Sequence, residues 1–127
     1  MSDMIPISKD EHNQQPVPSA WRPIFVEIVE AFKDGDFNLI RGVKTVRPVS
    51  EKRAKAMTDN IVEYGARLVS LPENTWQTSV CIWMLDYWEV LVDLYTMEEG
   101  ASDLVLHMRV YEEGPSYTYE VVNVYVP

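Results

Sequence analysis

The chain lacks most of the features from which a cellular location or a disulfide framework is commonly inferred. It has one cysteine, Cys81, in 127 residues, so no disulfide can form within the chain, which fits a reducing compartment. No apolar run approaches the roughly 18 residues that a membrane-spanning helix needs, and the first fifteen residues lack the apolar stretch of a signal peptide. We therefore expect a cytoplasmic protein with no membrane partner.

Basic residues are scarce as well. The sequence has 11 Lys and Arg against 20 Asp and Glu, a formal net charge of -9, whereas nucleic-acid binding requires clustered bases. The imbalance is uneven, since residues 41–72 carry seven bases and three acids while residues 73–127 carry ten acids and Arg109 alone. This separation of charge has three possible meanings. The two parts attract each other within the fold, they form two surfaces for different partners, or they are solvated faces that bind nothing.

Motifs of catalysis, metal binding and nucleotide binding are also missing. The sequence contains no HxH, CxxC or HExxH pattern, and neither of the glycine-rich phosphate loops GxGxxG and GxxxxGK[ST]. Cys81 lies between Val80 and Ile82 in an acidic part of the chain, unlike the electropositive surroundings that activate a thiol. We expect a buried structural cysteine, no cofactor and no metal.

The clearest pattern that is present lies in the C-terminal third. Over residues 87–95 and 103–111 the even positions are apolar, which is the period of half-buried strands. A polar segment that contains Gly100 connects these two strands and predicts an antiparallel hairpin. The numbers of two residues that face each other across this hairpin should add up to about 198 or 200, because both even faces then lie on the same side. A third strand follows, and its change of parity predicts a β-bulge near Val121 or a strand end buried on both faces.

The preceding part predicts two helices and one more strand. Helical spacing of apolar residues indicates a helix over residues 20–33 with Ser19 as its N-cap, and a second from Ser50 to about Ala66. Residues 75–85 are predicted to form a strand, and residues 37–49 give mixed signals.

Together these elements predict an α+β fold. We expect two N-terminal helices packed on one face of a four-stranded antiparallel meander sheet. Residues 1–18 form an extended or partly disordered arm in this prediction, and residues 19–127 form a single α+β domain.

The C-terminal half also resembles a family of small bacterial proteins of unknown function. The similar features are Trp76, Trp88, the run VLVDLYT, the segment from Glu99 to Leu104 and the closing VYV. The resemblance covers mainly residues 73–127 and implies no activity and no catalytic residues. Small acidic α+β proteins of this kind also resemble toxin-neutralising immunity proteins in size and charge.

The face opposite the even positions carries the candidate functional residues. It combines aromatic side chains with carboxylates, a composition typical of protein interfaces. The candidate binding residues on this face and in the adjoining turn are Tyr87, Glu89, Asp93, His107, Arg109, Tyr111, Glu98 and Glu99. In the alternative interpretation, residues 37–49 or the leading arm fold over this face and cover it.

Two functions follow from these observations. The first is a non-enzymatic protein-binding module, an immunity-type inhibitor or a homodimer, that uses the acidic aromatic face. The second is a small hydrolase or ligand-binding domain with a pocket between helices and sheet, in which His107 pairs with Asp93 or Glu89. The first is favoured because no nucleophile is placed beside His107.

Overall fold

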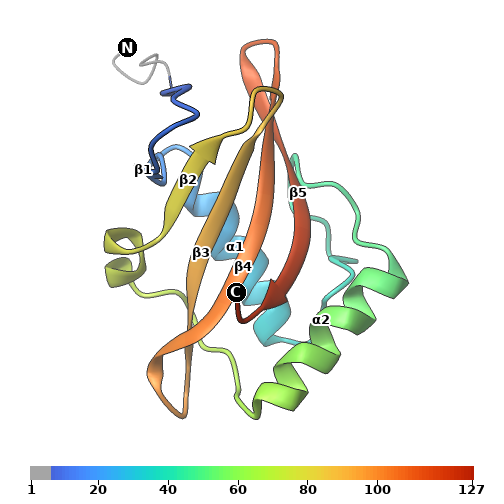
Figure 1. Cartoon of the computed structure of the whole chain (residues 1–127). Coiled ribbons are helices and arrows are strands. Elements are labelled where there is room, and N and C mark those ends of the chain that lie inside the picture. The colour runs from blue at the N-terminus through green and yellow to red at the C-terminus, as the bar shows by residue number, and fades with distance from the viewer. Residues whose placement is uncertain (1–6) are drawn as a thin grey trace.

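The computed structural model describes residues 7–127, so residues 1–6 of the expected arm lie outside it. Its elements are, in order, β1 (Gln15–Pro16), α1 (Arg22–Lys33), α2 (Glu51–Tyr64), the 3₁₀ helix η2 (Glu73–Gln77), β2 (Val80–Trp83), β3 (Trp88–Thr96), β4 (Gly100–Glu113) and β5 (Ser116–Tyr125). The five strands form one antiparallel sheet in sequence order, with α1 behind it and α2 beside the end of β5 (Figure 1). Within residues 7–127 no helix has the length and apolar character needed to cross a membrane.

The α+β class is confirmed, but the prediction of four strands is wrong. The fifth strand, β1, comes from the expected arm, and Gln15 and Pro16 pair with Cys81 and Val80 of β2. A two-residue strand has no period to detect, and prolines are uncommon in strands because they donate no backbone hydrogen bond. Because β1 precedes α1, the two helices are also not the first elements of the fold.

The strand predicted over residues 75–85 is only partly correct, because its first part forms η2. Thr75 is fully buried, and its hydroxyl donates to the backbone oxygen of Asp93 at 2.5 Å. The hydroxyl of Ser79 accepts from the backbone N–H of Asp93 at 2.9 Å. These side chains bond the backbone of β3 where β2 does not reach it, so residues 75–79 depart from an extended strand.

One of the two predicted helix caps is confirmed. The Ser50 hydroxyl accepts from the backbone N–H of Arg53 at 3.1 Å, and α2 ends at Gly65, which has the left-handed φ of 80°. Ser19 was the wrong cap for α1, because the helix begins at Arg22 and no side chain caps it. Ser19 instead lies in a turn, where its backbone oxygen accepts from the N–H of Arg22 at 3.3 Å.

The predicted hairpin and bulge are both present. Val92 pairs with Leu106 and Glu89 pairs with Arg109, in the predicted register of 198, although the register shifts closer to the turn. Between β4 and β5 the pairing moves from His107 with Asn123 to Met108 with Val121. Val122 is therefore the extra residue of a bulge, which allows Val121 and Val124 to be buried despite their opposite parity.

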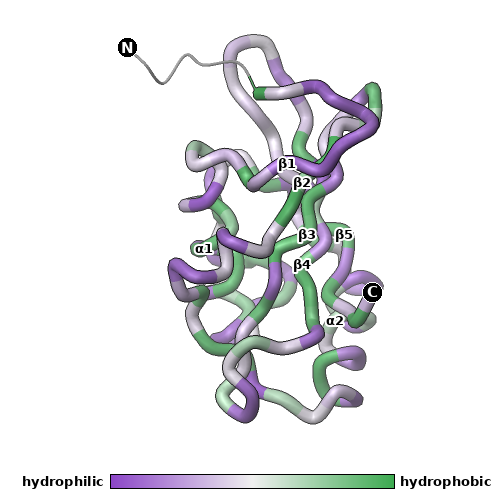
Figure 2. Tube along the Cα trace, turned by 60° about the vertical axis from the view of Figure 1, so that its left-hand side comes forward, coloured by the Kyte–Doolittle hydropathy of each residue, from purple (hydrophilic) through white to green (hydrophobic). Residues whose placement is uncertain are grey.

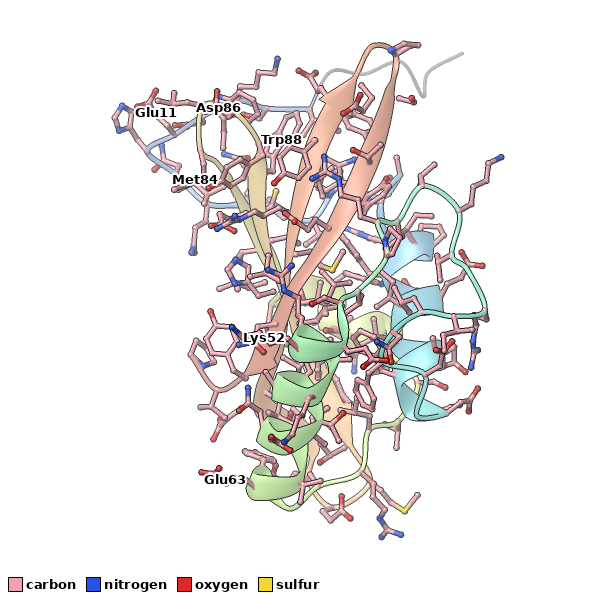
Figure 3. All side chains as sticks on the ribbon, turned by 90° about the vertical axis from the view of Figure 1, so that its right-hand side faces the viewer. Glu11, Lys52, Glu63, Met84, Asp86 and Trp88 are labelled. Atoms are coloured by element: carbon pink, nitrogen blue, oxygen red, sulfur yellow. The ribbon has the colours of Figure 1, made fainter. Side chains whose placement is uncertain are left out.

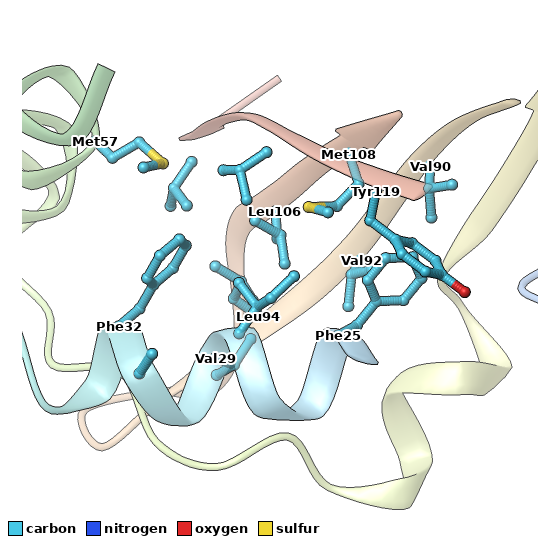
Figure 4. Close-up of a cluster of buried hydrophobic side chains, with 14 of the residues drawn as sticks. Phe25, Val29, Phe32, Met57, Val90, Val92, Leu94, Leu106, Met108 and Tyr119 are labelled. Carbon is cyan, nitrogen blue, oxygen red and sulfur yellow. The ribbon is translucent and has the colours of Figure 1, made fainter. Parts of the chain in front are cut away.

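The core lies between the sheet and the helices. Apolar side chains of α1 meet those of β3, β4 and β5, and Met57 of α2 closes one end (Figure 4). At the other end the ring of Trp21 lies 5.2 Å from that of Trp88 and 5.6 Å from that of Tyr117. The strongly hydrophilic segment before β1 lies at the end of the molecule away from α2 (Figure 2).

Both edges of the sheet are closed by other parts of the chain. Along β5, the backbone of Tyr119 bonds Thr45 and Arg47 at 3.0 and 2.9 Å. Arg53 and Asn60 of α2 donate to the backbone oxygens of Val121 and Val124 at 2.7 and 2.9 Å. The opposite edge is covered by three parts of the chain. β1 pairs with β2, and the hydroxyls of Thr75 and Ser79 bond the backbone of Asp93 in β3. Further along β3, the N–H of Val69 donates to the backbone oxygen of Tyr95 at 3.1 Å. The sheet therefore offers little free backbone at its edges.

We predict that Asn60→Ala lowers the free energy of unfolding by ~1–2 kcal/mol, because the oxygen of buried Val124 loses its side-chain donor. Urea unfolding followed by tryptophan fluorescence measures the change. The matched control is Asp59→Ala on the same helix, which removes only an exposed ion pair with Lys55 and should change stability by less than about 0.5 kcal/mol. Equal effects of the two substitutions would contradict the edge-closing role of Asn60.

Candidate functional site

The face of the sheet opposite α1 is left open by the described part of the chain (Figure 1). We call it the outer face. Its residues alternate along the strands with the buried core positions, and all of them except Val105 are half-buried. They are Val80, Ile82, Tyr87, Glu89, Leu91, Asp93, Tyr95, Val105, His107, Arg109, Tyr111, Glu120 and Tyr125.

Within residues 7–127, neither residues 37–49 nor the arm covers the outer face, although Gln14 of the arm lines a hollow on it. Residues 37–49 run along the edge of β5, and only Arg47 reaches over, with its guanidinium 4.1 Å from the ring centre of Tyr111. The segment before β1 packs mainly on the core side, where the oxygen of Ser8 accepts from the indole N–H of Trp88 at 2.9 Å. The outer face therefore remains a surface.

Three of the predicted site residues, Tyr87, Arg109 and Tyr111, form a packed group on this face. The ring centres of Tyr87 and Tyr111 lie 5.5 Å apart, and the guanidinium of Arg109 lies 4.9 Å from the centre of Tyr87. The Tyr111 hydroxyl donates to Glu120 at 2.8 Å. Burial and then this hydrogen bond raise the pKa of Tyr111 above its ordinary value, so the hydroxyl stays protonated as a donor at neutral pH.

His107 pairs with Glu89 and not with Asp93. Its Nε2 atom lies 2.5 Å from Glu89 Oε1, and the Nε atom of Arg109 lies 3.4 Å from the same oxygen. The side chains of His107 and Glu89 are only 17% and 21% exposed. Across the ladder His107 faces Leu91, which leaves Glu89 and Asp93 on its two diagonals. The longer glutamate side chain reaches the imidazole, while the Asp93 carboxylate has no hydrogen-bond partner within residues 7–127.

The two acidic turn residues are not brought together with the other six. Glu98 accepts hydrogen bonds from the backbone N–H and the guanidinium of Arg67, both at 2.8 Å. These bonds, with the backbone bond as the larger cause, lower the pKa of Glu98. Glu99 accepts from the hydroxyl of Tyr64. The turn is therefore tied to the end of α2 and the segment after it.

A hollow with a volume of about 200 Å³ opens on the outer face beside the Glu89–His107 pair. Apolar atoms make up most of its lining. The residues around it are Gln14, Val80, Cys81, Ile82, Glu89, Leu91, His107 and Tyr125.

The sequence prediction did not include Gln14, Val80 or Ile82 among the site residues. In β2 the even-numbered residues lie on the outer face, whereas in β3 the odd-numbered residues do. This follows from the pairing of Val80 with Leu91 and of Ile82 with Glu89. The tight β2–β3 turn sets this register, and its conformation, with Leu85 at a positive φ of 76°, leaves no clear mark in the sequence. Residues 80–83 are all apolar, so the sequence pattern did not say which parity faces the core.

His107 lies on the face of the sheet opposite α1, so within residues 7–127 it lines no pocket between that helix and the sheet. A larger groove of about 680 Å³ does lie between the C-terminal ends of α1 and α2, next to Met97. The two cations that line it are engaged, Lys33 with Glu30 at 2.9 Å and Arg67 with Glu98 at 2.8 Å.

The turn between β2 and β3 is a further exposed feature. Met84 and Asp86 lie near Glu11 at one end of the molecule, far from Glu63 at the other end (Figure 3). Met84 and Leu85 are 45% and 63% exposed. Two apolar side chains at a hairpin tip make a small patch, whereas the outer face is a continuous surface across four strands.

Metal and thiol chemistry have weak support at these sites. Among the residues that the structure describes, no three His, Cys, Asp or Glu side chains are grouped as metal ligands would be. Cys81 is 2% exposed, and its burial raises the pKa of the thiol to about 11. A thiol with so high a pKa is mostly protonated at neutral pH and is a poor nucleophile.

Comparison with known proteins agrees with the predicted resemblance to an uncharacterised family. A family described as "Domain of unknown function (DUF7668)" matches residues 29–127. No curated protein and no solved structure matches the chain.

We predict that the protein loses stability at alkaline pH because two buried groups hold their protons more tightly in the folded state. Burial raises the pKa of Cys81 from 9.0 to about 11 and that of Tyr119 from 10.0 to about 12. The stabilisation is complete below pH 9 and is lost as the pH rises through these ranges, by about 2 kcal/mol for each group. Urea unfolding between pH 7 and 11 measures the decline.

Two variants separate the contributions. Tyr119→Phe should remove the part of the decline that begins near pH 10, whereas Cys81→Ala should remove the part that begins near pH 9. A parent protein with a constant free energy of unfolding between pH 9 and 11 would contradict the prediction.

Proposed function

We propose that this chain, which belongs to the DUF7668 family of unknown function, is a non-enzymatic module that binds a basic protein through its outer face. One observation carries the proposal. The chain uses its own residues to cover the opposite face and both edges of the sheet, and it leaves open a face of four strands that bears tyrosines and apolar side chains. A half-exposed sheet face that combines aromatic and apolar side chains with carboxylates has the composition of an interaction site.

The residue types on the face support protein recognition. Tyrosine and arginine are the residues that contribute most to binding energy at protein interfaces. Tyr87 already packs against both Tyr111 and Arg109, and Tyr111 is held by its bond to Glu120. Side chains that are held in place before binding lose less conformational entropy when a partner docks.

Charge favours a basic partner over a second copy of the chain. The formal net charge is -9, and residues 73–127, which form four of the five strands, contain ten acids with Arg109 as their only base. The net negative charge of the whole chain repels a second copy, while a basic partner is attracted and steered toward it. An immunity-type inhibitor of a basic toxin is one form of this proposal.

A hydrolase is the weaker candidate. Glu89 orients the ring of His107, as the supporting carboxylate does in many catalytic groups. The thiol that lines the same hollow belongs to Cys81, and its raised pKa keeps it unreactive. The pair therefore lacks an activated nucleophile from this source and is better explained as part of a binding surface.

The partner is first captured by cross-linking in the native host and then purified. We predict that it binds the parent protein and that substitutions in the packed group of Tyr87, Arg109 and Tyr111 weaken this binding. Tyr111→Ala and Tyr87→Ala should each weaken the Kd at least about 30-fold, the effect of an interface hot spot of about 2 kcal/mol. Calorimetric titration of the purified pair measures the Kd, and raising the salt concentration should weaken it further.

The matched control is Tyr64→Ala, a tyrosine that bonds the β3–β4 turn and lies off the outer face. Its Kd should stay within about twofold of the parent value, with circular dichroism confirming that all variants are folded. A complex that survives both outer-face substitutions would refute the proposal. A dimer of this chain that both substitutions disrupt would keep the outer face as an interface but refute the basic partner.

A further inference from the structure

The hollow beside Glu89 and His107 carries an inference about how the partner is recognised. We infer that it is the anchor site for one tryptophan or tyrosine side chain of the partner, so the inference rests on the proposed function. Four observations support it: the volume of the hollow, its openness, its apolar walls and one unpaired carboxylate oxygen.

The volume fits a single aromatic ring system. The hollow measures about 200 Å³, and cavities of about 150 Å³ in other proteins accept benzene. Pockets for small-molecule ligands are generally larger, about 300–1,000 Å³. The hollow is therefore large enough for one side chain and small for most free ligands.

The hollow is open toward solvent on the outer face. A free small molecule bound there would stay partly wet, whereas ligand sites bury most of the ligand surface. A side chain that belongs to a protein is covered by the rest of the interface, whose surrounding contacts exclude water. An open hollow on a surface of this kind is therefore better suited to a tethered side chain.

The walls provide apolar contact from three strands. Val80 and Ile82 come from β2, Leu91 from β3 and Tyr125 from β5. The ring of Tyr125 lies 6.0 Å from the ring of His107, so an inserted ring would meet both aromatic and aliphatic groups. Aromatic anchors gain most from such surroundings, because each buries about 150–250 Å² of surface.

The polar group at the hollow selects an aromatic residue with a donor. Glu89 Oε1 is engaged by His107 and Arg109, but Glu89 Oε2 accepts no hydrogen bond from any side chain or backbone group in residues 7–127. A half-buried carboxylate oxygen favours a hydrogen-bond donor. The indole N–H of tryptophan and the hydroxyl of tyrosine supply one, whereas leucine and phenylalanine do not.

The inference is tested with a small mimic of the anchor. N-acetyl-L-tryptophanamide at millimolar concentration should cause saturable shifts of the backbone amide signals of Leu91, His107 and Tyr125 in NMR spectra of the ¹⁵N-labelled full chain. Its 1-methylindole analogue, which lacks the N–H donor, should bind at least about tenfold more weakly, because a bond to a charged group is lost. N-acetyl-L-leucinamide should cause no saturable shift.

A filling variant links the hollow to the partner. Leu91→Trp should occupy the hollow, abolish the shifts caused by the probe and weaken the Kd of the purified partner at least about 30-fold. Val62→Trp is the matched control, because Val62 is 72% exposed on α2 and does not line the hollow. Both measurements should be unchanged in this control.

Two results would overturn the inference. The first is the absence of saturable shifts with the tryptophan probe, or shifts that persist unchanged in Leu91→Trp. The second is a partner Kd that Leu91→Trp leaves unaltered, which would assign the hollow to a free aromatic compound or to no ligand. In either case the outer face is judged separately by Tyr111→Ala and Tyr87→Ala, since neither residue lines the hollow.

Discussion

Hydrogen bonding of the backbone along the two edges of the sheet is the constraint on which the rest of the structure depends. An open antiparallel sheet leaves a row of unpaired N–H and C=O groups on each edge strand. Here the loop before α2, together with Arg53 and Asn60 of that helix, closes the β5 edge. β1, η2 and the segment around Val69 close the other. The N-terminal half therefore serves the sheet as an edge cover as much as a core layer.

Because so much of the chain is used at the edges and on the core face, the outer face is the face of the sheet that residues 7–127 leave open. Some of its polar groups are paired within the face, as Glu89 is with His107 and Arg109. Its tyrosines are packed against one another and against arginines. A surface of this kind is ordered before binding and differs from the solvated, unpaired charges found elsewhere on the molecule.

The candidate site was predictable from sequence to the extent that it depends on one hairpin. The register of β3 and β4 follows from alternation and turn chemistry, so the shared face of Glu89, His107 and Arg109 was correct. The choice between Glu89 and Asp93 as partner of His107 was not predictable. It depends on side-chain reach across a twisted ladder, and both residues occupy equivalent diagonal positions in the sequence pattern.

The sequence by itself determined the α+β class, the α2 helix with its Ser50 cap and the core face of β3 and β4, since each follows from periodicity or local turn chemistry within a short segment. It also showed the change of parity in β5, but the pairing in the structure was needed to assign that change to a bulge at Val122. Only the tertiary structure decided what depends on contacts between distant segments. The short β1, the outward parity of Val80 and Ile82, the closure of both edges and the hollow beside Glu89 all belong to this group. They arise from segments up to about a hundred residues apart meeting in space, and no local pattern encodes such meetings.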